Sequence, residues 1–242
     1  MDPAFANKKV VALDLDGTIT QHRTEIDARN RDVLDALSQK YRLLIAGAGL
    51  CMRIWKQLRF FPIDIIGCYG MQYAAYDRVS GTLEIKRSEH AGCDRESVLR
   101  RVAVLRERFG YTEYAGDPVD FHESGAVTIA LLGTKARIED KLAFDPTREK
   151  RRPIYPHVVE LFPDYNVFVG GSSSFDMAPK PFDKYYALDR FCLEEGYSHS
   201  DVVFIGDDYG PGGNDEAVYR SDFDFITTDD YRELAKAAER LL

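Results

Sequence analysis

The chain has 242 residues, of which 45% are hydrophobic and 30% charged, an ordinary soluble composition with room for one large domain or a core plus a smaller domain. Its net charge of −8 argues against nucleic acid as a partner, because a phosphate backbone requires a basic footprint. Its apolar runs fall short of the roughly 18 residues of a membrane span, and the segment MDPAFANKK is not typical of a secretory signal, so we expect no membrane partner.

The first third of the chain alternates short apolar runs with segments of helical periodicity. Apolar runs that end in turn residues predict strands at 10–13, 41–46 and 64–66. Between them, apolar residues at helical spacing predict helices at 24–39 and 50–60. This β-α-β-α-β order predicts a parallel sheet with right-handed crossovers.

The pattern changes after a predicted turn at Ser80-Gly81-Thr82 and returns near residue 182. The elements predicted in between are a helix at 94–109, a strand at 126–132, helical or mixed segments at 138–142 and 146–159, and a strand at 165–169. After them come a helix at 184–195, strands at 202–205 and 223–226, and a closing helix at 229–242. We therefore predict a core domain, residues 1–81 and 182–242, into which residues 82–181 are inserted as a second domain.

Two carboxylates follow the first predicted strand, in Asp14-Leu15-Asp16-Gly17-Thr18. The carboxyl end of a buried strand is where open α/β sheets bind ligands, and alternate residues of a strand point the same way. Carboxylates held together repel each other unless a proton or a cation intervenes, and Mg²⁺ is usually bound by one or two carboxylates with phosphate and water. The pattern predicts one Asp as a nucleophile toward phosphorus and the other as a proton carrier; the alternative is a strand followed by an acidic turn.

A second acidic segment, GDDYGPGGNDE, follows the strand predicted at 202–205. Asp207 stands at the end of that strand, where it can share a metal ion with Asp14 and Asp16. Asn214 and Asp215 are candidates to orient these ligands from outside. Taken alone, GGND is more typical of an Asx turn in a surface loop.

The DxDGT segment resembles the signature of the haloacid dehalogenase (HAD) superfamily. The resemblance implies an α/β fold with a Rossmann-like parallel-sheet core and an inserted α+β cap domain. It also implies Asp14 as the nucleophile that forms an aspartyl-phosphate. Asp16 is implied as the general acid/base, with its backbone carbonyl on Mg²⁺.

Three further segments resemble the eukaryotic phosphomannomutase branch of that superfamily. They are the GDxxxxGGNDxE pattern from Gly206, the GGxxSFD pattern from Gly170, and Phe182-Asp183-Lys184 in place of a WDK triplet. The resemblance implies Lys184 as a catalytic lysine that faces the phosphate. It implies Arg23, Ser174 and Asp176 as substrate-binding residues.

The chain departs from that family in two places. The turn Gly47-Ala48-Gly49 lacks the usual Ser or Thr hydroxyl, so Gly47 is predicted to bind phosphate through backbone N–H groups. Where the family has arginines that hold a distal phosphate, this chain has Glu123, Thr134 and Lys141.

A mutase needs two phosphate sites, whereas a phosphatase needs only one. We therefore predict a Mg²⁺-dependent phosphatase that hydrolyses a sugar phosphate or a similar small monoester through an aspartyl-phosphate. A phosphomannomutase is the alternative, and a non-catalytic protein that binds sugar phosphates is a further one. The four cysteines form no CxxC pair, which predicts free thiols in a reducing cytoplasm rather than zinc or disulfides. For the oligomeric state, the sequence is compatible with a monomer and with a homodimer.

Overall fold

The computed structural model describes residues 2–242, and the chain divides into two compact units. Unit 1 contains the residues up to Ser88 together with Lys184–Gly210 and Asp215–Leu242. Unit 2 contains Glu89–Asp183 and Pro211–Asn214. Within residues 2–242, none of the helices combines the length and the apolar character that crossing a bilayer requires.

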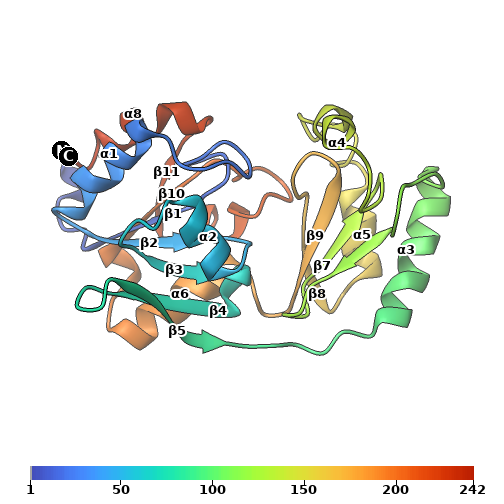
Figure 1. Ribbon diagram of the computed structural model, residues 1–242, viewed down its shortest axis with the longest axis horizontal. Helices are drawn as coiled ribbons and strands as arrows, with labels where there is room; N and C mark the ends of the chain where they lie inside the picture. Colours follow the sequence, from blue (N-terminus) through green and yellow to red (C-terminus); the bar gives the residue numbers. More distant parts are fainter. Residues whose placement is uncertain (1) are drawn as a thin grey trace. The chain divides into compact units, whose positions relative to one another are not determined.

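Unit 1 is built on a seven-stranded sheet in the order β11-β10-β1-β2-β3-β4-β5 (Figure 1). The first five strands in that order are parallel, as the β-α-β-α-β pattern predicts, and β4 pairs antiparallel with both β3 and β5. The strands are β1 (Val10–Leu13), β2 (Arg42–Ala46), β3 (Asp64–Gly67), β4 (Gln72–Asp77), β5 (Thr82–Ser88), β10 (Val202–Gly206) and β11 (Asp224–Thr227).

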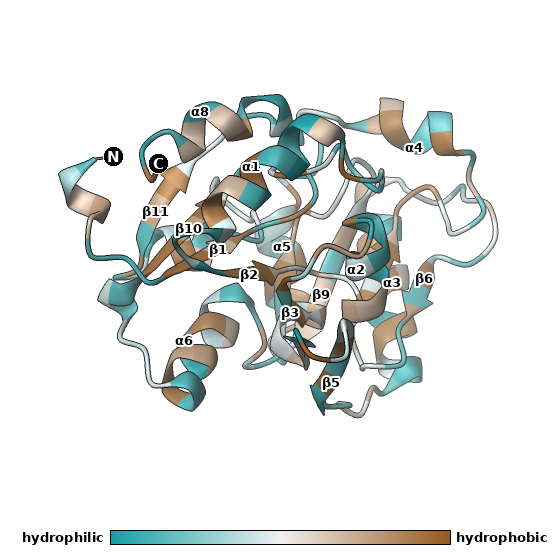
Figure 2. Ribbon diagram, turned by 60° about the vertical axis from the view of Figure 1, so that its left-hand side comes forward, coloured by the Kyte–Doolittle hydropathy of each residue, from teal (hydrophilic) through white to brown (hydrophobic). Residues whose placement is uncertain are grey.

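Both faces of this sheet are buried under helices. Val11 and Leu13 of β1 belong to one apolar cluster with α1, α2 and α8, while Val10 and Ala12 belong to another with α6 and α7. Figure 2 shows β1 and β2 as hydrophobic strands beneath α1, whose residues change between hydrophilic and hydrophobic around the helix. The helices are α1 (Ala28–Ser38), α2 (Cys51–Gln57), α6 (Lys184–Glu195), α7 (Glu216–Tyr219) and α8 (Leu234–Ala238), with 3₁₀ turns at Pro3–Phe5, Cys68–Gly70, His199–Asp201 and Tyr231–Glu233.

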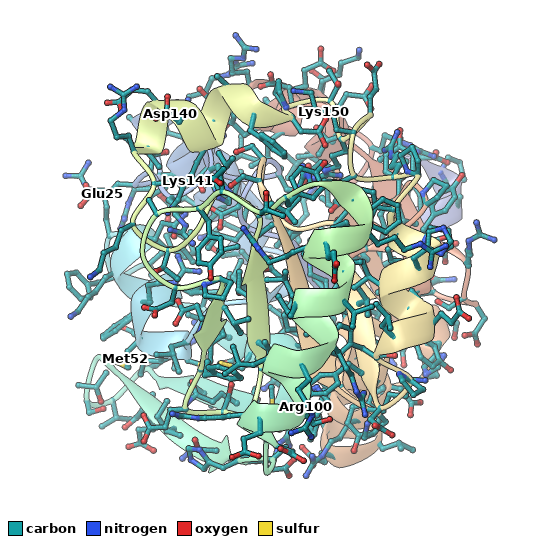
Figure 3. All side chains as sticks on the ribbon, turned by 90° about the vertical axis from the view of Figure 1, so that its right-hand side faces the viewer. Glu25, Met52, Arg100, Asp140, Lys141 and Lys150 are labelled. Carbon is teal, nitrogen blue, oxygen red and sulfur yellow. The ribbon has the colours of Figure 1, made fainter. Side chains whose placement is uncertain are left out.

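Unit 2 is a four-stranded antiparallel sheet in the order β6-β7-β9-β8, with α3 and α5 packed on one face (Figure 1). Arg100 lies on the exposed side of α3, whereas Lys141 belongs to α4, which buries none of its residues (Figure 3). The elements are α3 (Arg95–Phe109), β6 (Val119–Phe121), β7 (Val127–Ala130), α4 (Ile138–Phe144), α5 (Tyr155–Leu161), β8 (Tyr165–Phe168) and β9 (Ser174–Pro179).

The fold class is confirmed, and several local predictions are corrected. The predicted start of the insertion at residue 82 is wrong, because residues 82–88 form β5 and pair with β4 in the sheet of unit 1. The segment around Ser174 is not only a motif loop but the start of β9. The closing helix is shorter than 229–242, because a 3₁₀ turn precedes α8.

Candidate active site

The two acidic segments meet because their strands are neighbours in the sheet. β1 and β10 pair in parallel with Val10 opposite Val202 and Leu13 opposite Ile205. The register continues one step further, where the amide of Asp14 donates to the carbonyl of Ile205 at 2.9 Å. Asp207 follows β10 directly, so both carboxylates emerge at the carboxyl edge of the sheet.

Three carboxylates gather at this edge: Asp14, Asp207 and Asp215 each offer an oxygen within 4.8 Å of the others. Asp14 and Asp215 are buried and Asp207 is half-buried. Lys184 begins α6 and is fully buried. Its Nζ donates to Asp14 Oδ1 at 2.5 Å and to Asp215 Oδ1 at 2.6 Å. The cluster therefore holds three carboxylates and one ammonium group, which contacts two of them.

Burial and mutual repulsion govern the ionisation of this cluster. Burial, opposed by Lys184 and reinforced by Asp215 and Asp207, raises the pKa of Asp14 well above its ordinary value. Burial, together with the charges of Asp215 and Asp208, raises the pKa of Asp207 to about 6. For Lys184, burial acts to lower the pKa, but the two carboxylates in contact outweigh it and raise the pKa. The excess of negative charge fits a divalent cation bound by oxygen ligands, such as Mg²⁺.

Asp207 is held against the first motif by two of its residues. Thr18 Oγ1 donates to Asp207 Oδ1 at 2.9 Å, and Thr18 is fully buried. Gly17 has a φ of +102°, and a Cβ on this residue would lie 2.7 Å from Asp207 Cγ. The glycine is therefore required both by the backbone conformation and by the close approach of the carboxylate.

The Asp215 carboxylate lies within the cluster itself, and its predicted role of orienting the ligands stays a prediction. Its Oδ2 accepts from the amide of Asp208 at 3.0 Å, and its own amide donates to the Asp208 carbonyl at 3.0 Å. A Cβ on Gly206 would lie 2.9 Å from Asp215 Cγ, so the glycine leaves room for this side chain. Asn214, by contrast, groups with unit 2, and its orienting role stays a prediction.

The carboxylate of Asp16 is not part of that cluster, although its position directly follows the same strand. Asp16 Oδ1 accepts from the backbone N–H of Arg23 at 2.7 Å and from Gln57 Nε2 at 2.7 Å. Arg23 is exposed and has a φ of +59°, an uncommon conformation for a side chain of this size. The predicted metal contact of Asp16 through its carbonyl and the predicted substrate contact of Arg23 are not tested by these bonds.

The prediction for Gly47 needs a correction. Its amide donates to the carbonyl of Ile66 at 2.9 Å, so this N–H is already used within the sheet. Its carbonyl accepts from Tyr69, and the Gly49 carbonyl accepts from Cys68. The next two amides, of Ala48 and Gly49, donate to no acceptor within residues 2–242 and are the ones left for an anion.

The predicted sugar-binding residues Ser174 and Asp176 lie on β9 in unit 2. Ser174 Oγ donates to the Gly170 carbonyl at 3.1 Å, and Asp176 Oδ1 accepts from Thr128 Oγ1 at 2.9 Å. Because Thr128 uses its only hydrogen there, His122 Nε2, 3.0 Å away, must donate to the threonine. These side chains alternate with the core residues of β7 and β9, so they occupy the sheet face that α3 and α5 leave uncovered.

A buried arginine, which no sequence pattern indicates, supports the loop between β8 and β9. Arg151 is fully buried, and its guanidinium pairs with Asp145 at 2.9 Å. It also donates to the carbonyls of Gly170, Gly171 and Ser174, at 2.5, 2.9 and 2.8 Å. Its sequence context, a run of basic residues, is more typical of a solvated face, so no local pattern indicates it.

The positions at which the family carries arginines have other partners here. Thr134 Oγ1 accepts from the amide of Asp117 at 3.0 Å, and Lys141 Nζ donates to the Thr134 carbonyl at 2.9 Å. Glu123 is exposed, and its carbonyl lies 3.2 Å from His90 Nδ1. None of these three positions supplies a guanidinium.

Comparison with known proteins identifies relatives along the whole chain. The sequence profile of the family described as eukaryotic phosphomannomutase matches residues 95–229. A phosphomannomutase of Encephalitozoon cuniculi is 24% identical over 260 residues, covering 97% of this chain and 95% of the relative.

Solved structures agree in fold. A haloalkanoate-superfamily phosphatase of Bacteroides thetaiotaomicron superposes with a TM-score of 0.64 at 14% identity, covering 99% of this chain and 96% of that one. An IMP-bound IMP-nucleotidase of Plasmodium falciparum gives a TM-score of 0.70 at 13% identity, covering 97% of this chain and 68% of that one. At such identities the likeness shows the fold alone.

Proposed function

The chain belongs to the eukaryotic phosphomannomutase family and is a phosphoryl-transfer enzyme of the HAD type, and on that premise we propose that it moves the phosphoryl group of a hexose phosphate through a covalent intermediate on Asp14. The observation that carries this proposal is the buried Asp14 carboxylate, which contacts Lys184 within an acidic cluster at the carboxyl edge of the sheet. The contact with Lys184 opposes the rise in pKa that burial causes, and so favours the ionised form of Asp14 that a nucleophile requires.

The proposed reaction has two steps on the residues of unit 1. A carboxylate oxygen of Asp14 attacks phosphorus as the bond to the ester oxygen breaks, and that oxygen takes a proton from Asp16 as it leaves. In the second step a hydroxyl oxygen attacks the same phosphorus, gives its proton to the Asp16 carboxylate, and Asp14 is regenerated. Lys184 neutralises charge on the transferred group.

Magnesium is part of the proposal because the residues present fit it. Asp14 and Asp207 would hold the ion with the carbonyl of Asp16, while Asp215 keeps Lys184 in place. When bound, Mg²⁺ would supply positive charge to the phosphoryl oxygens. Chelation with EDTA should abolish turnover, and Mg²⁺ should restore it.

Two candidate functions differ in the group that accepts the phosphoryl group from Asp14 in the second step. The family and its relatives favour phosphomannomutase, in which the acceptor is a sugar hydroxyl and the product is the isomeric hexose phosphate. We take this as the first candidate, in place of the phosphatase that the sequence analysis predicts from the missing cap arginines.

One observation favours the phosphatase, in which the acceptor is water. The positions of the family's arginines carry Glu123, Thr134 and Lys141, and the Lys141 ammonium is already bonded to a backbone carbonyl. Without guanidinium groups there, retention of a bisphosphorylated sugar is weaker, and release before the second transfer leaves the aspartyl-phosphate to water.

The test supplies mannose 1-phosphate, Mg²⁺ and a catalytic amount of hexose 1,6-bisphosphate, and measures mannose 6-phosphate and inorganic phosphate together. A mutase forms mannose 6-phosphate in excess over phosphate, and a phosphatase releases phosphate with little isomer. If neither product forms from a panel of sugar phosphates, phosphoryl transfer is refuted and the non-catalytic binding protein remains.

Asp14→Asn should abolish turnover without unfolding the chain, because the amide keeps the shape of the side chain but is no nucleophile. The measurements are product formation and urea denaturation of both proteins. Retention of more than a trace of activity by a folded Asp14→Asn protein contradicts the nucleophile assignment.

We also propose a cytoplasmic location. Burial raises the pKa of the Cys51 and Cys192 thiols to about 12, so both are protonated and unreactive near neutral pH. Free buried thiols of this kind are typical of reducing compartments. Cell fractionation of a tagged full-length chain tests this.

A further inference from the structure

The side chain of Gln57 reaches the carboxylate of Asp16 from the end of α2. Gln57 is 8% exposed, and its Nε2 lies 2.7 Å from Asp16 Oδ1. The backbone amide of Arg23 donates to the same oxygen at 2.7 Å. Asp16 Oδ1 therefore accepts two N–H bonds, one from a helix and one from the loop that follows the first motif.

The amide of Gln57 has only one orientation that satisfies its neighbours. Its Oε1 accepts from Arg53 Nη1 at 2.9 Å, and the second hydrogen of Nε2 points to Thr20 Oγ1 at 2.9 Å. A flipped amide would place its oxygen against the Asp16 carboxylate and its NH₂ group against the Arg53 guanidinium, leaving both contacts repulsive.

Gln57 also anchors the loop on the far side of Asp16. Its backbone carbonyl accepts from the amide of Ile26 at 2.9 Å, and Ile26 is buried. The loop between Asp16 and Ile26 includes Arg23, whose left-handed backbone turns its N–H toward Asp16. One residue of α2 thus fixes both the carboxylate and the loop that supplies its second donor.

These bonds occupy Oδ1 of Asp16 and leave Oδ2 available for proton transfer. Asp16 Oδ2 accepts no hydrogen bond from residues 2–242, and the side chain is half-buried. We propose that Gln57, oriented by Arg53, is a positioning residue that holds Asp16 Oδ1 and so presents Oδ2 to the oxygen that leaves phosphorus. This inference rests on the acid/base role of Asp16 in the proposed function.

Proton delivery matters only when the leaving group needs a proton. A hexose oxygen leaves as a strongly basic alkoxide unless it is protonated, whereas 4-nitrophenolate leaves readily without a proton. The ratio kcat/KM reports the steps up to departure of that group, so it isolates the first transfer from the second. Loss of positioning should therefore lower kcat/KM selectively for the sugar ester.

The test compares Gln57→Met, which keeps the length of the side chain but removes its donors, with the wild-type protein on a hexose phosphate and on 4-nitrophenyl phosphate. We expect kcat/KM to fall roughly 100-fold for the hexose phosphate and less than about 3-fold for the aryl ester. Arg53→Met, which frees the amide to flip, should give the same selectivity with a smaller loss. Gln39→Met at the exposed end of α1 is the matched control and should change neither value.

An equal loss on both esters by Gln57→Met and Arg53→Met, or no loss on either, overturns the inference and leaves the proposed function standing. Inactivity of the wild-type protein toward both esters and toward sugar phosphates overturns the proposed function, and the inference with it. Urea denaturation of every variant shows whether it is folded. If Gln57→Met does not fold, the ratio measured for Arg53→Met decides.

Discussion

Replacing Lys184 with methionine should destabilise the protein strongly in Mg²⁺-free buffer. The substitution removes a fully buried ammonium group that bonds Asp14 at 2.5 Å and Asp215 at 2.6 Å. Methionine fills similar volume, so the main loss is electrostatic. Removing one partner of a buried ion pair costs about 3–5 kcal/mol, which is a large part of the roughly 5–15 kcal/mol that stabilises a typical domain.

The assay is urea denaturation of the wild-type and Lys184→Met proteins with EDTA present. Lys56→Met is the control, because Lys56 is exposed on α2 and its loss should change the free energy of unfolding by less than about 0.5 kcal/mol. The double mutant Lys184→Met/Asp215→Asn should recover part of the loss, since it leaves one fewer unpaired carboxylate. A loss below about 1 kcal/mol for Lys184→Met would refute the view that this lysine compensates the acidic cluster.

Three further outcomes are expected. Gly17→Ala should lose most of its activity, because the added Cβ would meet Asp207. The control is Gly196→Ala, at φ +75° with open space around it, which should only reduce stability, by about 1 kcal/mol. Equal activity of the two variants would contradict this prediction. Burial acts to lower the pKa of His199, but hydrogen bonds from the imidazole to Asp222 and Asp189 outweigh it and raise that pKa. A group with a raised pKa stabilises the fold below its unfolded pKa near 6.5, and this contribution is lost as the pH rises through the folded pKa. In urea denaturation, His199→Gln should therefore cost more stability at about pH 5.5 than at about pH 9. A cost that does not depend on pH would count against the charged pair. Asp176→Asn should raise KM for a hexose phosphate but leave kcat/KM for 4-nitrophenyl phosphate unchanged. Asp35→Asn, at an exposed position of α1 in unit 1, is the control. No change in the sugar KM would remove Asp176 from the sugar site.

Local patterns were sufficient for the central strands and for the family. The run Val10–Leu13 ends in two aspartates and a glycine, and both the buried strand and the resemblance to HAD proteins follow from that stretch, as the family match and the fold confirm. The hairpin of β4 and β5 was not predicted, because Tyr73 and Ala74 interrupt its regular pairing and its residues are partly exposed. The start of the inserted segment was misplaced for the same reason.

Local patterns in the chain are enough to locate the residues that carry chemistry, since apolar runs, turn glycines and short motifs depend on neighbouring residues. Which of these residues share a site depends on how the strands and helices pack. Lys184 and Asp14 are 170 positions apart, and they meet because β1 and β10 pair in one register while α6 packs beneath them. The loop after β10 places Asp215 on Lys184, and the docking of α2 places Gln57 on Asp16. These contacts arise from strand order and helix docking rather than from spacing along the chain, so local patterns do not reveal them.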